Sequence, residues 1–163
     1  MKRTNVDVMA LRVPGPRQSP ATRGVEGGAP AHEHVSSQAS QSEPQRVVVV
    51  DDNPDWCDLL RALLERDGSF RVVAQTGDGE SGLAAVREHQ PDVVMLDLAL
   101  PVMDGFQAFP LIRQEASRAK VIVVSGSDPN LISFSSAGPD AYFRKGSSLK
   151  GLIARVHEVV AAS

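Results

Sequence analysis

Short apolar runs alternate with amphipathic stretches from Arg46 to the end of the chain, and this alternation most constrains the fold. The first run, Val47 to Val50, is β-branched throughout, which indicates a strand buried on both faces. By the same criteria we expect strands at 47–50, 70–74, 93–96, 121–124 and 141–143. Helices are expected at about 54–66, 80–89, 105–116 and 129–137, with a last one over 149–159. Five such units predict an α/β fold, a doubly wound (βα)5 domain with a five-stranded parallel sheet and helices on both faces.

Residues 1–45 have a different composition from the rest of the chain. They are rich in proline, glycine, serine and glutamine, contain no aromatic residue and show no sustained periodicity. Such a segment buries too little apolar surface to offset its ordering entropy. We therefore expect a disordered N-terminal leader over 1–45, either a solvated extension or a tether for a partner, and one folded domain over 46–163.

The overall composition favours a cytoplasmic protein. No apolar run approaches the roughly 20 residues needed to cross a bilayer, so no membrane partner is expected. The single cysteine, Cys57, forbids an internal disulfide and a cysteine-based zinc site. The net charge of -3 at pH 7 gives no reason to expect nucleic-acid binding, which usually comes with a basic balance.

Polar residues follow four of the five predicted strands. Asp51 and Asp52 come after the first, Asp97 after the third, Ser125 after the fourth and Lys145 after the fifth. The carboxyl ends of parallel strands share one edge of the sheet, so these side chains should converge there. Three carboxylates beside one ammonium repel one another, and a divalent cation relieves that repulsion. Oxygen-only ligands favour Mg²⁺.

A magnesium site beside a carboxylate, an ammonium and a hydroxyl suits phosphoryl transfer. A carboxylate can act as the nucleophile and form an acyl phosphate. The metal ion and the ammonium balance charge on the transferring group, and the serine can donate a hydrogen bond to it.

Four motifs give the chain a family resemblance. They are Val-Val-Val-Asp-Asp at 48–52, Pro-Asp-Val-Val-Met-Leu-Asp-Leu-Ala-Leu-Pro-Val-Met-Asp-Gly at 91–105, Val-Ile-Val-Val-Ser-Gly at 121–126 and Ala-Tyr-Phe-Arg-Lys at 141–145. In this order, each with its own strand, they resemble the response-regulator receiver domain of two-component signal transduction. The resemblance covers 46–163 and implies a flavodoxin-like fold.

The resemblance also implies roles for the acidic residues. Asp97 would be the phospho-acceptor, supplied by a sensor histidine kinase or a histidine phosphotransfer protein. Asp52, Asp97 and the backbone carbonyl of Ala99 would hold Mg²⁺ directly, and Asp51 would reach the ion through water.

The remaining site residues take their roles from the same resemblance. Ser125 and Lys145 would bind the phosphoryl oxygens, and Tyr142 would form a switch with Ser125. We therefore expect a receiver that stands alone or is cut from a longer protein, that is not an enzyme, and that signals through contact with a downstream protein. Too few residues follow Lys145 for a DNA-binding output domain. An alternative is a phosphorelay intermediate that passes its phosphoryl group to a histidine phosphotransfer protein.

Two other functions share parts of the pattern. Residues 77–82 read Gly-Asp-Gly-Glu-Ser-Gly, a match to the dinucleotide-binding fingerprint. Acidic side chains in that turn would repel a pyrophosphate, so a tight turn before a helix is favoured over a dinucleotide site. Asp97-Leu98-Ala99 is similar to the nucleophile loop of haloacid-dehalogenase-like phosphatases, which need a second aspartate where Ala99 stands.

The chain departs from the usual receiver pattern in three places. Gly146 stands where the family has proline after its lysine. Pro110 falls inside a predicted helix and should kink it or delay its start. The interval from Ser125 to Lys145 is short, which predicts a shortened helix at 129–137.

Overall fold

One parallel sheet organises the folded part of the chain in the computed structural model, which describes residues 43–128, 133–134 and 137–162. Its strands are β1 (Gln45–Val50), β2 (Phe70–Thr76), β3 (Val93–Leu96), β4 (Lys120–Ser125) and β5 (Ala141–Arg144). They lie in the order β2-β1-β3-β4-β5, and all four pairings are parallel. The predicted doubly wound α/β fold is confirmed.

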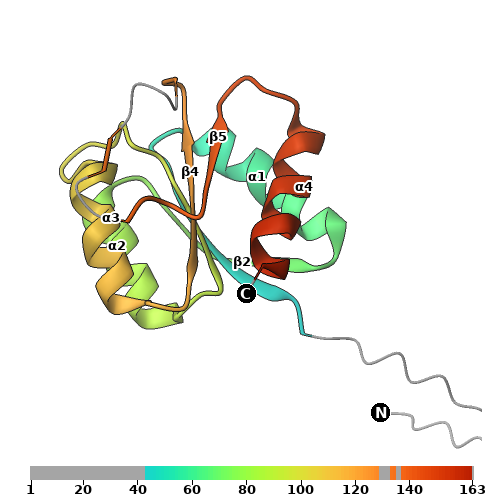
Figure 1. The fold of residues 1–163 in the computed structure, drawn as a ribbon, viewed down its shortest axis with the longest axis horizontal. Coiled ribbons are helices and arrows are strands. Elements are labelled where there is room, and N and C mark those ends of the chain that lie inside the picture. Colours follow the sequence, from blue (N-terminus) through green and yellow to red (C-terminus); the bar gives the residue numbers. More distant parts are fainter. Residues whose placement is uncertain (1–42, 129–132, 135–136, 163) are drawn as a thin grey trace, which may run out of the picture. The chain divides into compact units, whose positions relative to one another are not determined.

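Helices cover both faces of this sheet. They are α1 (Pro54–Asp67), α2 (Gly79–His89), α3 (Gly105–Glu115) and α4 (Leu149–Ala161). Figure 1 shows α2 and α3 on one side of the strands and α1 and α4 on the other. Among the described residues, no helix is both long and apolar enough to cross a bilayer.

The alternation of side chains along each strand explains the two layers. Val47 and Val49 belong to the core cluster with α1 and α4, whereas Val48 and Val50 belong to the cluster with α2 and α3. All four side chains are fully buried. A strand with apolar residues on both faces can sit only between two helical layers, which is what the unbroken valine run predicts.

Short polar side chains set where the helices begin. Asn53 accepts a hydrogen bond from the Trp56 N–H at 3.1 Å, and Pro54 occupies the first position of α1. Asp104 and Gln107 form a reciprocal capping box at the start of α3. Such caps satisfy backbone N–H groups that have no partner within the helix.

Three expectations about the chain's irregular parts have different outcomes. The helix expected over about 129–137 lies largely outside the described residues, and Ser133 and Phe134, which are described, are not helical. Pro110 does lie inside α3, but it does not delay the helix, which begins at Gly105. The disordered leader stays a prediction, because residues 1–42 lie outside the described part of the chain.

The strand order indicates a candidate site between two neighbouring strands of the sheet. The chain leaves β1 towards β2 and then crosses to β3 on the other side of β1. In open parallel sheets, ligands bind at the carboxyl ends of the strands where this order reverses. Here that point lies between β1 and β3, the strands that lead into Asp51 and Asp97.

Candidate functional site

Three carboxylates meet at the carboxyl ends of β1 and β3. Asp51, Asp52 and Asp97 each offer an oxygen within 4.8 Å of the other two. Asp51 is 3% exposed and Asp97 4%, while Asp52 lies at the surface. The Asp97 N–H donates to the Val50 oxygen at 2.8 Å, so the sheet ladder itself fixes the spacing of the two buried groups.

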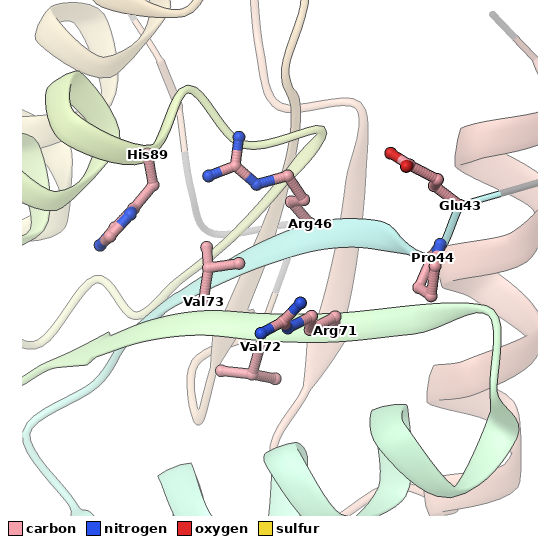
Figure 2. A pocket seen from close by; sticks show the side chains of 7 residues that line it. All are labelled: Glu43, Pro44, Arg46, Arg71, Val72, Val73 and His89. Atoms are coloured by element: carbon pink, nitrogen blue, oxygen red, sulfur yellow. The ribbon is translucent and has the colours of Figure 1, made fainter.

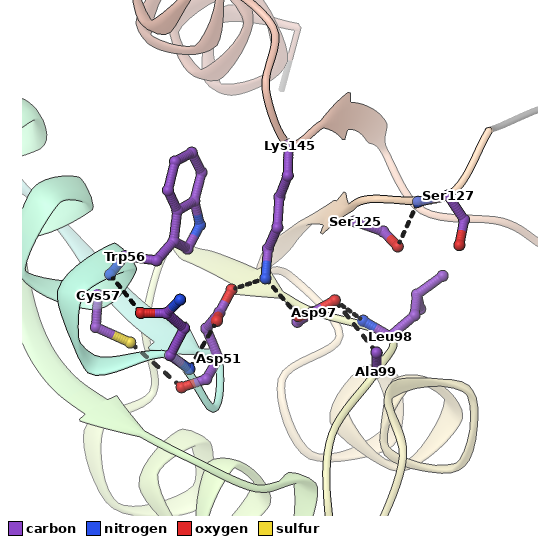
Figure 3. A network of polar contacts seen from close by, with 10 residues as sticks. Asp51, Trp56, Cys57, Asp97, Leu98, Ala99, Ser125, Ser127 and Lys145 are labelled. Carbon is purple, nitrogen blue, oxygen red and sulfur yellow. Dashed lines mark hydrogen bonds and ion pairs between the residues drawn. The ribbon is translucent and has the colours of Figure 1, made fainter.

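Lys145 is the counterion of the buried pair. Its Nζ lies 2.6 Å from Asp51 Oδ2 and 2.5 Å from Asp97 Oδ2, as Figure 3 shows. Burial lowers the pKa of the ammonium, but its bonds to both carboxylates outweigh that effect and leave the pKa above its ordinary value. Lys145 therefore remains charged at neutral pH and bridges the two aspartates.

The Asp97 carboxylate is held in one orientation. Its Oδ1 accepts the N–H of Leu98 at 2.6 Å and that of Ala99 at 3.2 Å. Its Oδ2 faces Lys145. A methyl group at Gly105 would lie 2.1 Å from the Asp97 backbone oxygen, so only glycine lets α3 start this close to the acidic loop.

Asp51 is also fixed on both oxygens. Its Oδ1 accepts the Asn53 N–H at 3.0 Å, and its Oδ2 faces Lys145. Burial raises the pKa of this carboxyl, an effect that Lys145 and the Asn53 N–H reduce without cancelling. The nearby Cys57 thiol donates to the Asp51 backbone oxygen at 3.3 Å. Burial and the Asp51 charge raise the pKa of that thiol to about 11, which makes it a structural group.

Ser125 is the last residue of β4, and Tyr142 is the second residue of β5. Ser125 is buried, and its hydroxyl accepts the Ser127 N–H at 3.3 Å. The Tyr142 hydroxyl is buried and has no hydrogen-bond partner among the described residues. Burial, and then the charge on Asp97, raise the pKa of this phenol to about 12. The structure thus gathers Tyr142 near Asp97 but turns the Ser125 hydroxyl toward its own loop.

The donor set fits a hard divalent cation. Among the described residues it consists of the carboxylate oxygens of three aspartates, with no sulfur or imidazole ligand. One lysine cannot neutralise three aspartates, so a cation would lower the electrostatic energy of the cluster. Oxygen ligands of this kind suit Mg²⁺.

One neighbour of the site was not predicted from the sequence. The ring of Trp56 has its centroid 6.0 Å from Lys145 Nζ. Trp56 belongs to the first turn of α1, directly after the Asp51-Asp52 pair, and Lys145 follows β5. The only available signal was that both elements reach the same edge of the sheet, which does not specify a contact.

The glycine-rich turn at 77–82 has a packing role. The Gly79 N–H, which a pyrophosphate would need, donates to the Met103 oxygen at 3.1 Å. A methyl group at Gly79 would lie 2.4 Å from that oxygen, and one at Gly82 would lie 2.8 Å from Val50. Asp78 caps α2 through Ser81. These contacts argue against a dinucleotide at this turn.

A separate surface hollow of about 680 Å³ lies at the opposite, amino-terminal end of β1 and β2. Figure 2 shows Arg46, Arg71 and His89 around it, with Val73 at its floor. Arg46 and Arg71 face each other in register across the two strands. Charged side chains on an edge strand protect it from pairing with other chains, which accounts for Arg71 without a ligand.

Sequence comparison places this geometry in a known family. The sequence model of the response regulator receiver domain matches residues 47–157. The DNA-binding response regulator MtrA of Mycolicibacterium smegmatis is 36% identical over 113 residues, which are 69% of this chain and 49% of that protein. A protein-glutamate methylesterase/protein-glutamine glutaminase of Azospirillum brasilense is 41% identical over 87 residues, 53% of this chain and 22% of that protein.

Solved structures agree with this assignment. The signal receiver domain of the response regulator NarL from Mycobacterium tuberculosis superposes with a TM-score of 0.68 at 29% identity, covering 75% of this chain and 100% of that one. A CheY-like receiver domain protein from Methanospirillum hungatei gives a TM-score of 0.67 at 26% identity, over 73% and 95% of the two chains.

These relatives correct one expectation. The chain was expected not to be an enzyme, yet several homologues are named as an enzyme, protein-glutamate methylesterase/protein-glutamine glutaminase. The match to each of these three covers 22% of its length and only its receiver part.

The matched span of the family includes all five strands of the sheet from Val47 onward, and with them the acidic cluster and Lys145. The chain belongs to the response-regulator receiver domain family of two-component systems.

Proposed function

We propose that Asp97 accepts a phosphoryl group from a sensor histidine kinase or a histidine phosphotransfer protein. The observation that carries this proposal is the asymmetry of the Asp97 carboxylate. Two backbone N–H groups bind Oδ1, at 2.6 and 3.2 Å, whereas the partner of Oδ2 among the described residues is the Lys145 ammonium. One oxygen is thus anchored and the other is available for bond formation.

The proposed reaction follows from that asymmetry. Asp97 Oδ2 attacks the phosphorus of a phosphohistidine, an O–P bond forms and the P–N bond breaks. The electron pair of the broken bond goes to the imidazole nitrogen, and the proton on the other ring nitrogen leaves the donor histidine neutral. Lys145 moves from the carboxylate oxygen to a phosphoryl oxygen and keeps its charge partnered throughout. Ser125 rotates away from Ser127 and donates its hydroxyl to a second phosphoryl oxygen.

Mg²⁺ completes the site in this proposal. Asp51, Asp52, Asp97 and the Ala99 carbonyl would hold the ion, with Asp51 acting through water. When bound, the ion would neutralise charge on the phosphoryl oxygens. The cluster of three carboxylates around one lysine supports this assignment.

The phosphorylated domain would signal by contact with a downstream protein. Two large apolar side chains next to the Asp97 loop are exposed, Val102 at 82% and Phe106 at 43%. Val102 also has a positive φ of 64°, which is costly for a β-branched residue. An apolar surface that changes when the adjacent loop is phosphorylated is suited to recruiting a partner.

Incubation with acetyl phosphate and Mg²⁺ tests the chemistry. Intact mass should show one added phosphoryl group, EDTA should prevent it, and the Asp97→Asn variant should remain unmodified. Asp58→Asn is a matched control, because Asp58 is an exposed carboxylate on α1. If the Asp97 variant is labelled as well as the wild type, the site assignment is wrong.

A further inference from the structure

Trp56 stands at the edge of the site without belonging to the predicted set of residues. The backbone N–H of Trp56 donates to Asn53 Oδ1 at 3.1 Å, and the thiol of the next residue, Cys57, donates to the Asp51 backbone oxygen at 3.3 Å. The first turn of α1 is therefore tied twice to the loop that carries Asp51. These contacts fix the backbone from which the Trp56 side chain extends.

The indole ring lies near the ammonium of Lys145. Its centroid lies 6.0 Å from Nζ, which is within the range of about 6 Å over which an aromatic face attracts a cation. Figure 3 shows the ring beside the lysine chain, with Asp51 and Asp97 at the far end of that chain. Two carboxylates and one aromatic ring are thus neighbours of the ammonium.

No hydrogen bond within the described structure orients the ring. The indole nitrogen is buried and unpartnered there, while the half-buried side chain packs against the core cluster of α1 and α4. Packing and the Lys145 contact therefore hold the ring. Tryptophan attracts cations more strongly than the other aromatic side chains, whereas an aliphatic residue would pack there without that attraction.

We propose that Trp56 is a positioning residue for Lys145. The inference rests on the proposed function, in which Lys145 moves from Asp97 to the incoming phosphoryl group. A lysine ammonium on its flexible stem has many orientations, and the indole confines it to those that remain above Asp97. Removal of the ring should slow phosphorylation by about two- to fivefold, the range for one partly exposed cation–π contact.

Two variants and one control separate the ring from simple packing. Trp56→Phe keeps an aromatic face, Trp56→Leu keeps only apolar volume, and Leu59→Ala changes the same helix one turn further on. The first readout is the NMR shift of the Lys145 ε-methylene protons, which a ring face moves upfield. The second is the phosphorylation rate constant with acetyl phosphate and Mg²⁺.

The proposal expects an upfield Lys145 signal in the wild type and in Leu59→Ala, a smaller displacement in Trp56→Phe, and none in Trp56→Leu. The phosphorylation rate constant should be highest in the wild type and Leu59→Ala, lower in Trp56→Phe and lowest in Trp56→Leu. A wild-type signal at the position of an unperturbed lysine would overturn the proposal even if Trp56→Leu did not fold. So would equal rates for the wild type and Trp56→Leu. If the wild type shows the shift but accepts no phosphoryl group, the proposed function fails while the Trp56–Lys145 contact stands.

Discussion

Lys145 should stabilise the folded domain as well as take part in its chemistry, and Lys145→Met tests this. The substitution keeps most of the side-chain volume and removes the charge that bridges Asp51 and Asp97. Two unit charges 4.8 Å apart, the outer limit for this cluster, repel by about 3–4 kcal/mol at an effective dielectric constant of about 20. Removing one partner of a buried ion pair costs about 3–5 kcal/mol.

The expected loss lies at or below the lower end of that range, because the Lys145 side chain is 24% exposed and water screens part of the interaction. We expect Lys145→Met to lower the free energy of unfolding by about 2–4 kcal/mol near pH 7 in EDTA. Excess Mg²⁺ should restore most of this loss, since the ion replaces the missing charge. Stability should also recover as the pH falls below neutral, because a carboxyl whose folded pKa is raised favours folding once it is protonated.

Urea denaturation of the wild type and the variant, with EDTA or MgCl₂, measures these effects. Lys150→Met is the matched control, since Lys150 is an exposed lysine on α4, and it should change stability by less than about 0.5 kcal/mol. If Lys145→Met is as stable as Lys150→Met in EDTA, Lys145 does not offset the repulsion between the buried aspartates.

Three further outcomes follow from individual contacts. Gly105→Ala should destabilise the domain by about 1–3 kcal/mol in urea denaturation and abolish labelling of Asp97, whereas Gly126→Ala, where a new methyl group meets nothing within 4 Å, should retain labelling. Burial raises the pKa of Asp140, but bonds from the Val121 N–H and from arginine outweigh it, so the pKa lies below its ordinary value of 3.8. The stabilisation that Asp140 gives the folded state is thus present at neutral pH and lost as pH falls below about 4. In an acid titration followed by circular dichroism, Asp140→Asn should lack this acid-sensitive stabilisation of about 1–2 kcal/mol. Identical acid unfolding curves for the wild type and the variant would refute this. Limited proteolysis should leave a stable core that begins close to Arg46, and a protease-resistant leader would contradict the composition argument.

The fold could be predicted from the sequence because each strand carries its own signal. Val47–Val50 has apolar residues on both faces, Asn53 and Pro54 mark a helix start, and Pro91 separates α2 from β3. These are local rules with a direct steric or hydrogen-bonding basis. The convergence of the aspartates with Lys145 followed from topology, since parallel strands end at one edge.

Contacts that depend on side-chain direction could not be predicted in the same way. The Trp56–Lys145 approach joins α1 to the loop after β5, and no spacing rule relates those positions. Gly146 was expected to matter only as a missing proline. Its φ of +92° shows a left-handed backbone that proline, fixed near −65°, cannot adopt. The loop after Lys145 therefore differs from the usual receiver pattern in conformation as well as in sequence.

Ser125 and Tyr142 are arranged so that a small change in free energy could move both. The Ser125 hydroxyl accepts one hydrogen bond of 3.3 Å from Ser127, which is long and correspondingly weak. The Tyr142 hydroxyl is buried without a partner among the described residues, a cost of about 1–3 kcal/mol. Neither group is therefore strongly committed to its present position. A phosphoryl oxygen at Asp97 would offer Ser125 a charged acceptor, worth about 1.5–3 kcal/mol, which exceeds the bond that it would give up. Because a ligand shifts a two-state equilibrium only by the difference in its interaction energy with the two states, weak contacts at both residues would favour the proposed phosphorylation switch.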